Sequence, residues 1–214
     1  MGKRVGVLGS GQVAQVLAAG FKKLGHEVEI GSREAGKLHD FATKHGIKTG
    51  TVAETAAFGE LLVLAVRGKP APEVLKQAGA QNLAGKVVID VTNPIADEPP
   101  QNGMIRFFTG PNDSLMERLQ SAFPQARFVK AWNSIGAAFM VNPSFAGGPP
   151  TMFICGNDGA AKAEVAALLE RFGWSPEDMG MAESARAIEP LCQLWCAPGL
   201  LRNQWSHAFK LLKG

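Results

Sequence analysis

The fold of this chain is decided by residues 4–14, which read RVGVLGSGQVA. Residues 4–8 are a short apolar run typical of a buried strand, and the glycines Gly9 and Gly11 follow it. From Val13 onward the apolar residues recur every three or four positions, which is the period of a helix. The stretch therefore predicts a strand, a tight turn and a helix.

The same unit recurs along the chain. We expect further strands at 27–30, 61–66, 86–91 and 127–131, and helices at 34–44, 72–81 and 114–122. Apolar runs such as LLVLAV (61–66) are typical of parallel strands that are buried on both faces. The alternation predicts an α/β fold, a doubly wound and mostly parallel Rossmann-type sheet.

Two regions rich in proline and glycine interrupt this pattern. Residues 92–113 predict an ordered loop over the carboxyl ends of the strands, without long regular elements. Residues 142–150 predict a boundary, with a dinucleotide-binding domain at 1–148 and a small α/β extension at 149–214. In the extension we expect a strand at 152–155, a helix at 159–172 and a terminal helical stretch at 183–212. Pro190 and the Pro198-Gly199 pair would interrupt that last stretch.

Composition excludes several classes of protein. The net charge of +3 is too small to predict binding to nucleic acid or to a membrane surface. The chain has no tyrosine, which excludes reductases that use a tyrosine hydroxyl as general acid. Its three cysteines lack the spacing of a zinc site or a disulfide framework, so we expect no metal and a reduced, cytoplasmic setting. We expect no signal peptide and no membrane span.

The turn at residues 9–14 has the glycine pattern of a dinucleotide site. Gly9 permits the turn, Gly11 lets a pyrophosphate approach the backbone, and Ala14 permits close packing of helix on strand. The free N–H groups of the helix would bind the phosphates. The alternative is a glycine-rich turn that binds nothing.

The end of the second strand predicts which dinucleotide is bound. NAD enzymes place an acidic residue there, whereas this chain has Ser32 and Arg33. A hydroxyl and a guanidinium bind a 2′-phosphate through charge-assisted hydrogen bonds, so we predict NADP(H). Alternatively, Ser32 only caps the following helix.

Two further strand ends carry candidate ligands. Arg67 would cover the ribose or pyrophosphate, or would be a solvated side chain in a polar turn. Asn93 would hold the nicotinamide carboxamide, or would close a turn into Pro94.

Several stretches resemble the NADP oxidoreductases related to the NADPH-dependent reductase of the deazaflavin coenzyme F-420. They read VGVLGSGQVAQVLAAGFKKLGHEVEIGSRE, VVIDVTNPI, FVKAWNSIGAAFM, ARAIEPL and HAFKLL, and they span residues 5–212. The resemblance implies cofactor-binding roles for Gly9, Ser10, Gly11, Gln12, Val13, Ser32, Arg33, Val66 and Asn93. The soluble domain of membrane ferric reductases is similar. Residues 132–136 resemble bacterial members of uncertain substrate, so the resemblance leaves the second substrate open.

Hydride transfer to a flavin or deazaflavin needs stacked rings and little acid or base catalysis. The four histidines agree with this, because they lie in predicted helices or at their ends. His26 and His45 adjoin glycines at helix ends, where we expect partly exposed imidazoles. We predict a substrate pocket lined by Trp132, Asn133, Ser134 and Ile135, with Trp195, Trp205 and His207 opposite. The alternative places the tryptophans in the core and gives His207 a structural role.

Other functions stay open at this point. A 3-hydroxyacid or imine reductase would need a catalytic proton donor, and the C-terminal region offers Lys162, Lys210 and Lys213. A non-catalytic NADP(H)-binding redox sensor is also compatible. Cys192 and Cys196 lie four residues apart and are packed thiols, a redox pair or half of a metal site. Four Trp and twelve Phe favour a homodimer.

Overall fold

The computed structural model describes residues 2–214, and the central sheet of this described part has six strands, all parallel. The strand order is β3-β2-β1-β4-β5-β6. The strands are β1 (Arg4–Leu8), β2 (Glu27–Gly31), β3 (Lys48–Gly50), β4 (Leu61–Leu64), β5 (Val87–Asp90) and β6 (Arg127–Lys130). The chain winds outward in both directions from β1 and β4, which confirms the doubly wound fold.

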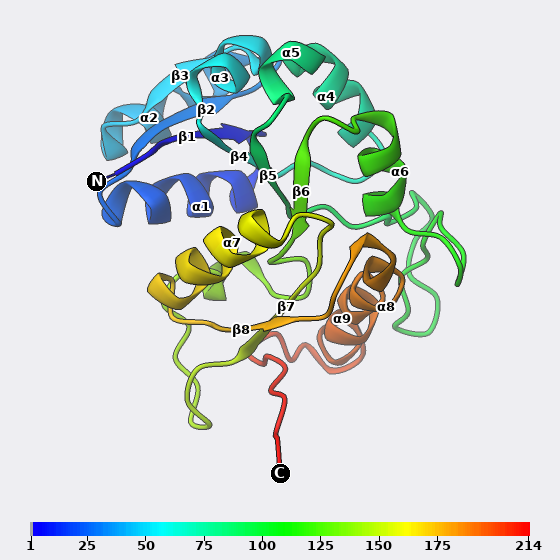
Figure 1. Cartoon of the computed structure of the whole chain (residues 1–214). Coiled ribbons are helices and arrows are strands. Elements are labelled where there is room, and N and C mark those ends of the chain that lie inside the picture. The colour runs from blue at the N-terminus through cyan, green and yellow to red at the C-terminus, as the bar shows by residue number, and fades with distance from the viewer. Residues whose placement is uncertain (1) are drawn as a thin grey trace.

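Helices cover both faces of this sheet (Figure 1). The chain up to residue 122 forms α1 (Gln12–Lys23), η1 (Ala35–Leu38), α2 (His39–His45), α3 (Val52–Phe58), α4 (Ala71–Ala78), α5 (Ala80–Leu83) and α6 (Leu115–Ala122). Alternate strand residues face opposite sides, so Val63 and Ile89 pack in one core cluster and Leu62 and Val88 in the other. The strands are consequently apolar along their whole length.

The C-terminal third adds a smaller layer. After η2 (Ala137–Phe139) come two paired parallel strands, β7 (Thr151–Ile154) and β8 (Ser175–Asp178). The helix α7 (Gly159–Arg171) connects them. An antiparallel bridge between Lys130 and Cys155 joins β7 to β6. The chain then forms η3 (Ala182–Ser184), α8 (Ala185–Ile188) and α9 (Leu191–Arg202). One core cluster includes residues of both layers.

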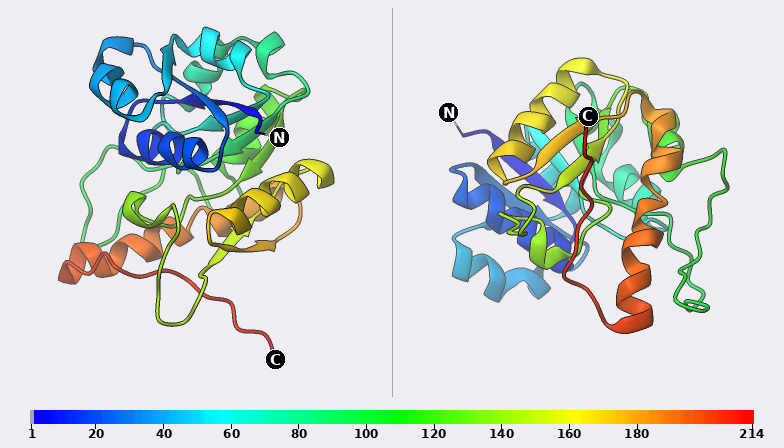
Figure 2. Two further views of the ribbon diagram at one scale, coloured as in Figure 1. Left: turned by 90° about the vertical axis from the view of Figure 1, so that its left-hand side faces the viewer. Right: turned by 90° about the horizontal axis from the view of Figure 1, so that it is seen from below.

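The predicted helix does not continue to residue 212. Pro190 separates α8 from α9 as expected, but Pro198 lies inside α9 and does not end it. The helix ends at Asn203, whose left-handed backbone (φ 54°) turns the chain away. Residues 203–214 then run without helix back to β7, where Thr151 N–H donates to the carbonyl of Phe209 (2.9 Å; Figure 2). The last regular elements of the extension are the helices α8 and α9, as expected, but the contact with a distant strand replaces the predicted helical turns beyond residue 202.

Four short elements were not predicted from the sequence: β3, α3, η2 and β8. The loop at 92–113, in contrast, forms isolated bridges only, between Ile95 and Phe107 and between Gln101 and Met104. The boundary at residues 148 and 149 stays a prediction.

Candidate functional site

The turn after β1 is held tightly by its neighbours. Gly9 has a φ of 139°, which favours glycine, and its N–H donates to the carbonyl of Gly31 at 2.8 Å. A Cβ at this position would lie 2.2 Å from the carbonyl oxygen of Ala65. The turn therefore passes between the ends of β2 and β4 with no room for a side chain.

The start of α1 is open where the turn meets it. A Cβ built on Gly11 would meet no heavy atom of the described chain within 4 Å. Gly11 is the N-cap, no side chain caps the helix, and the first turn holds no acidic residue. The first N–H groups of a helix have no partners within it and favour anions. Gly11, Gln12 and Val13 thus offer a fitting site for a pyrophosphate, with Ser10 held by Gln15 Nε2 on its carbonyl (3.0 Å).

Ser32 and Arg33 lie beside this turn, because β1 and β2 are in register and end together at Leu8 and Gly31. Ser32 Oγ accepts the N–H of Glu34 at 3.1 Å, so it closes a local turn and keeps its own hydrogen for another acceptor. It does not cap η1, whose N-cap is Glu34. Arg33 is exposed and forms no ion pair within residues 2–214. Both groups fit a 2′-phosphate.

A carboxylate nearby is already neutralised. Glu34 pairs with Lys37 at 2.7 Å. The hydrogen bond and the charge of Lys37 hold the pKa of Glu34 below its usual value. This pair reduces the repulsion that Glu34 would exert on a phosphate bound at Ser32 and Arg33.

The ends of β4 and β5 meet at the next part of the site. Val66 is half-buried and Arg67 is exposed. A Cβ on Gly68 would lie 2.1 Å from the carbonyl oxygen of Asn93, so the two loops touch. Asn93 Nδ2 donates to the carbonyl of Asn133 (2.7 Å), and Asn133 Nδ2 donates to Asn93 Oδ1 (3.2 Å). The amide of Asn93 therefore fixes the loop after β6 instead of closing a turn into Pro94.

The loop after β6 is less open than the sequence predicts for a pocket wall. Trp132, Asn133, Ser134 and Ile135 are all buried. The Trp132 ring packs in the core, 5.2 Å from the ring of Phe172. Trp132 therefore lies in the core and does not face a cleft. This is the alternative that the sequence left open for the tryptophans.

His207 lies in the segment that follows α9 and not on a helix. Its ring stacks on Trp195, with centroids 5.1 Å apart, and the Trp195 ring lies against Gly136. Trp205 lies against Gly199 and 5.7 Å from Trp195. These aromatic side chains hold the end of the chain onto α9 and the loop after β6.

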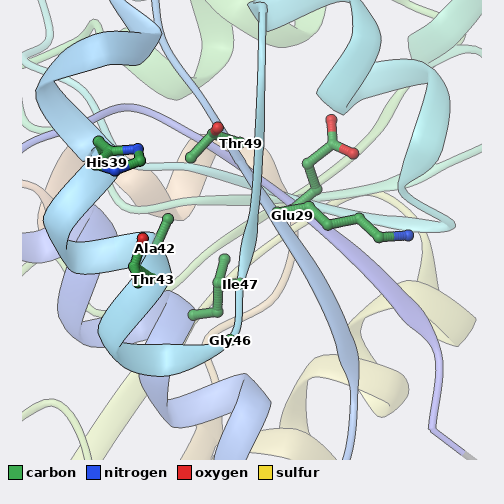
Figure 3. Close-up of a pocket in the computed structure, with 8 residues that line it drawn as sticks. Glu29, His39, Ala42, Thr43, Gly46, Ile47 and Thr49 are labelled. Atoms are coloured by element: carbon green, nitrogen blue, oxygen red, sulfur yellow. The ribbon is translucent and has the colours of Figure 1, made fainter.

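The described surface has a hollow beside the α8–α9 corner and another at the sheet edge formed by β3. One, of about 470 Å³, lies between the loop at 105–113 and the α8–α9 corner, with Phe107, Arg186 and Gln193 among its walls. The other, of about 500 Å³, lies at the sheet edge, where His39, Ala42 and Thr43 of α2 face Ile47 and Thr49 (Figure 3). The first borders α8 and α9, but none of the seven residues predicted to line the substrate pocket is among its lining residues, so the predicted pocket stays a prediction.

A buried ionic cluster at the ends of β5 and β6 was missed by the sequence analysis. Lys130 Nζ lies 2.7 Å from Asp90 Oδ2 and 3.0 Å from Glu189 Oε1, and all three side chains are at most 1% exposed. Burial opposes the charge of Lys130, but the two carboxylates outweigh it and raise the lysine pKa above its usual value. The available signal was a charged residue inside each of two otherwise apolar strands, VVIDV and FVKAW.

The cysteines are free thiols in the described structure. Cys192 is buried in α9, where the interaction with Cys196 and next burial raise the pKa of its thiol. The same interaction lowers the pKa of Cys196, although burial opposes this. Burial raises the pKa of Cys155 to about 12. Residues 2–214 contain no cluster of three or more metal-binding side chains and no helix able to cross a membrane.

His26 is 5% exposed, so the expectation of a partly exposed imidazole is wrong for this residue. Its ring packs edge-on against Phe21, and its Nδ1 accepts the N–H of Lys3 at 3.2 Å.

Comparisons with known proteins agree with this geometry. Residues 4–94 match the family described as NADP oxidoreductase, coenzyme F-420-dependent. A solved structure of a candidate F-420-dependent NADP reductase from Arthrobacter sp. FB24 is 35% identical, with a TM-score of 0.92 over 99% of this chain and 100% of that one. The metalloreductase STEAP3 of Rattus norvegicus is 33% identical over 92% of this chain. The chain spans 39% of the length of that relative and 37% of the human metalloreductase STEAP2.

An imine reductase from Aspergillus terreus, solved with NADPH4, shares the fold at 20% identity, with a TM-score of 0.68 over 95% of this chain and 64% of that one. Likeness at this level of identity supports the Rossmann-type architecture alone.

Proposed function

Because the chain belongs to the family of coenzyme F-420-dependent NADP oxidoreductases, we propose that it transfers a hydride between NADP(H) and a flavin or deazaflavin ring. The proposed binding of NADP(H) rests on one observation: the open start of α1 at Gly11 lies next to Ser32 and Arg33. An anion site at the helix and a cation at the neighbouring strand end match the pyrophosphate and the 2′-phosphate of one ligand.

Each part of the site has its own role in this proposal. Gly11, Gln12 and Val13 bind the pyrophosphate, and Ser32 and Arg33 bind the 2′-phosphate. Ser10, Val66 and Arg67 line the path between the adenosine and nicotinamide ends, and Asn93 lies at the nicotinamide end. NADPH, when bound, supplies the hydride from its nicotinamide ring. The protein then has to position two rings, and the proton that the reduced ring takes up comes from water, so little acid or base catalysis by side chains is needed.

The proposed site for the hydride acceptor is the hollow beside the loop at 105–113. Its apolar lining residues include Ile105, Phe107 and Pro190, and its polar and charged ones are Arg106, Thr109, Asp113, Arg186, Glu189 and Gln193. A flat ring system with polar substituents can use the apolar walls for stacking and the polar groups for orientation. We propose that the acceptor ring enters here, with Asn133, Ser134 and Ile135 between it and the cofactor. His207, which is bound to Trp195, then has a supporting role.

The competing reductase activity needs a proton donor, and the lysines that the C-terminal region offers are engaged elsewhere. Lys162 pairs with Asp178 and Lys213 with Glu177, both on β8. Lys210 Nζ donates to the carbonyl of Pro149. This favours ring-to-ring hydride transfer over reduction of a small carbonyl or imine.

The test is NADPH oxidation by the pure protein, followed at the nicotinamide absorbance. The deazaflavin coenzyme, FMN, FAD and riboflavin are offered separately, and NADH replaces NADPH in a parallel series. We expect turnover with at least one ring system and a clear preference for NADPH. Tight NADPH binding without reduction of any ring would favour the redox sensor. Turnover only with small carbonyl compounds or imines would favour the competing reductase.

A further inference from the structure

Lys130, the last residue of β6, has no contact with solvent. Its ammonium is surrounded by three acceptors: Asp90 Oδ2 at 2.7 Å, Glu189 Oε1 at 3.0 Å and the carbonyl of Thr92 at 2.8 Å. Removing one cation and two carboxylates from water has a large desolvation cost. Such clusters seldom stabilise a fold more than apolar residues of the same volume would. Stability alone therefore does not account for this cluster.

The cluster joins three segments that are distant in sequence. Asp90 Oδ1 accepts both the N–H (2.9 Å) and the hydroxyl (2.7 Å) of Thr92. Asp90 therefore fixes the position of Thr92, which follows the end of β5. Glu189 accepts the N–H groups of Leu115 and Met116, each at 3.0 Å. These groups form the N-terminus of α6, whose partial positive charge offsets the second carboxylate. Lys130 pairs with both carboxylates and so connects the end of β5, through Asp90, with the start of α6, through Glu189.

The position of Thr92 determines the position of its neighbour Asn93. Asn93 and Asn133 exchange hydrogen bonds, and Asn133 Nδ2 also donates to the carbonyl of Ile188 at 2.9 Å. Ile188 directly precedes Glu189, so the chain of contacts returns to the cluster. The loops after β5 and β6 and the α8–α9 corner are thus held in one arrangement around a buried cation.

One acceptor in this arrangement has neither a hydrogen-bond donor nor an ion-pair partner within the described residues. Asn133 Oδ1 is buried and has no hydrogen-bond partner among residues 2–214. A buried polar atom of this kind is costly unless a ligand or water satisfies it. The carboxamide of a nicotinamide carries an N–H₂ group, which is a donor of the required kind.

We propose that Lys130 is a positioning residue for the nicotinamide end of the cofactor. Its ammonium fixes Thr92, and through Thr92 the Asn93–Asn133 pair, so that Asn133 Oδ1 is presented to the carboxamide. The inference rests on the proposed binding of NADP(H), and it adds the device that sets the nicotinamide in place. Lys130 touches neither cofactor nor substrate in this account.

The experiment compares two ligands that differ only beyond the pyrophosphate, NADPH and 2′-phospho-ADP-ribose, by calorimetry. The variant is Lys130→Met combined with Asp90→Asn and Glu189→Gln, which leaves no buried charge unpaired. We expect its affinity for 2′-phospho-ADP-ribose to stay within about twofold of the wild type. Its NADPH affinity should fall about tenfold, the loss expected for one or two misplaced hydrogen bonds.

The matched control is Lys86→Met, because Lys86 precedes the other end of β5 and donates to the carbonyl of Ala56. It should change neither affinity. A folded triple variant with an unchanged ratio of the two affinities would show that the cluster is only structural. If the triple variant does not fold, Thr92→Val removes a single hydrogen bond to Asp90 and should lower the ratio about threefold. An unchanged ratio in Thr92→Val would equally overturn the proposal.

The wild type separates this inference from the proposed function. If wild-type protein does not bind NADPH, the proposed function itself fails. If it binds NADPH and the variants leave the ratio unchanged, only the role of Lys130 fails.

Discussion

Trp195 and His207 bind each other twice. Trp195 Nε1 donates to the carbonyl of His207 at 2.9 Å, and His207 Nε2 lies 2.9 Å from the carbonyl of Trp195. A carbonyl only accepts, so the imidazole carries its hydrogen on Nε2. The rings are also nearly parallel, at 26°. This pair attaches the non-helical end of the chain to α9.

Replacing His207 with Ala should weaken that attachment. The change removes one hydrogen bond and the stacking, so we expect the free energy of unfolding to fall by about 1 to 3 kcal/mol. Urea unfolding followed by tryptophan fluorescence measures it. His39→Ala, on the exposed surface of α2, is the control and should stay within about 0.5 kcal/mol of the wild type. Equal stability of both variants would contradict a role for the pair.

The two glycines of the turn should respond in opposite ways to alanine. Gly9→Ala forces a Cβ to within 2.2 Å of the Ala65 carbonyl and should lower the free energy of unfolding by more than about 2 kcal/mol. Gly11→Ala meets open space and should leave stability within about 0.5 kcal/mol. It should nevertheless weaken NADPH binding, because the methyl group occupies the place of the pyrophosphate. Chemical unfolding and NADPH titration separate the two effects, and unchanged NADPH affinity in Gly11→Ala would count against the site.

Arg33→Ala should weaken NADPH binding by about 1.5 to 3 kcal/mol and leave NADH binding nearly unchanged. The reason is that only NADPH carries the 2′-phosphate. Calorimetry with both cofactors measures the difference. Arg202→Ala, at the far end of α9, controls for the loss of one positive charge. Equal losses for the two cofactors would remove Arg33 from the 2′-phosphate site.

Stability should depend on pH through His26. Burial, and next the charge of Arg171, hold the pKa of His26 below its usual 6.5. As the pH falls below that value, the unfolded chain takes up a proton that the folded chain resists, so stability decreases. The decrease ends once the pH passes below the folded pKa. Urea midpoints from about pH 8 to about pH 5 should show the decrease in the wild type and a flatter curve in His26→Gln. Parallel curves would refute the assignment.

A homodimer is expected from the apolar surface of the C-terminal region. Leu194 and Leu201 on α9 are 57% and 55% exposed. Apolar side chains exposed in this way often pack against a second subunit. Sedimentation velocity at micromolar concentration should therefore give twice the chain mass of 22.7 kDa, whereas a 22.7 kDa species would contradict the dimer.

The sequence by itself determined the nucleotide half of this protein. The glycine pattern at residues 9–14, the apolar strands and the missing acidic residue before Arg33 are local signals. Backbone conformation and strand burial follow from such signals, because both depend on residues close in the chain. The doubly wound sheet is accordingly confirmed, and the turn at Gly9 has the geometry expected of it.

Only the tertiary structure decided how the strand ends, the loop after β6 and the C-terminal segment are arranged around the predicted nicotinamide end of the site. Lys130 contacts Asp90 and Glu189, which lie 40 and 59 residues away in the sequence. The spacing of apolar residues along the chain does not predict such contacts. The end of the chain leaves its helical pattern because Thr151 and Trp195 bind it from far away in the sequence. Trp132 lies in the core because Phe21 and Phe172 pack around it. The free energy of such contacts depends on which distant groups share the same buried space, and only the folded chain specifies that.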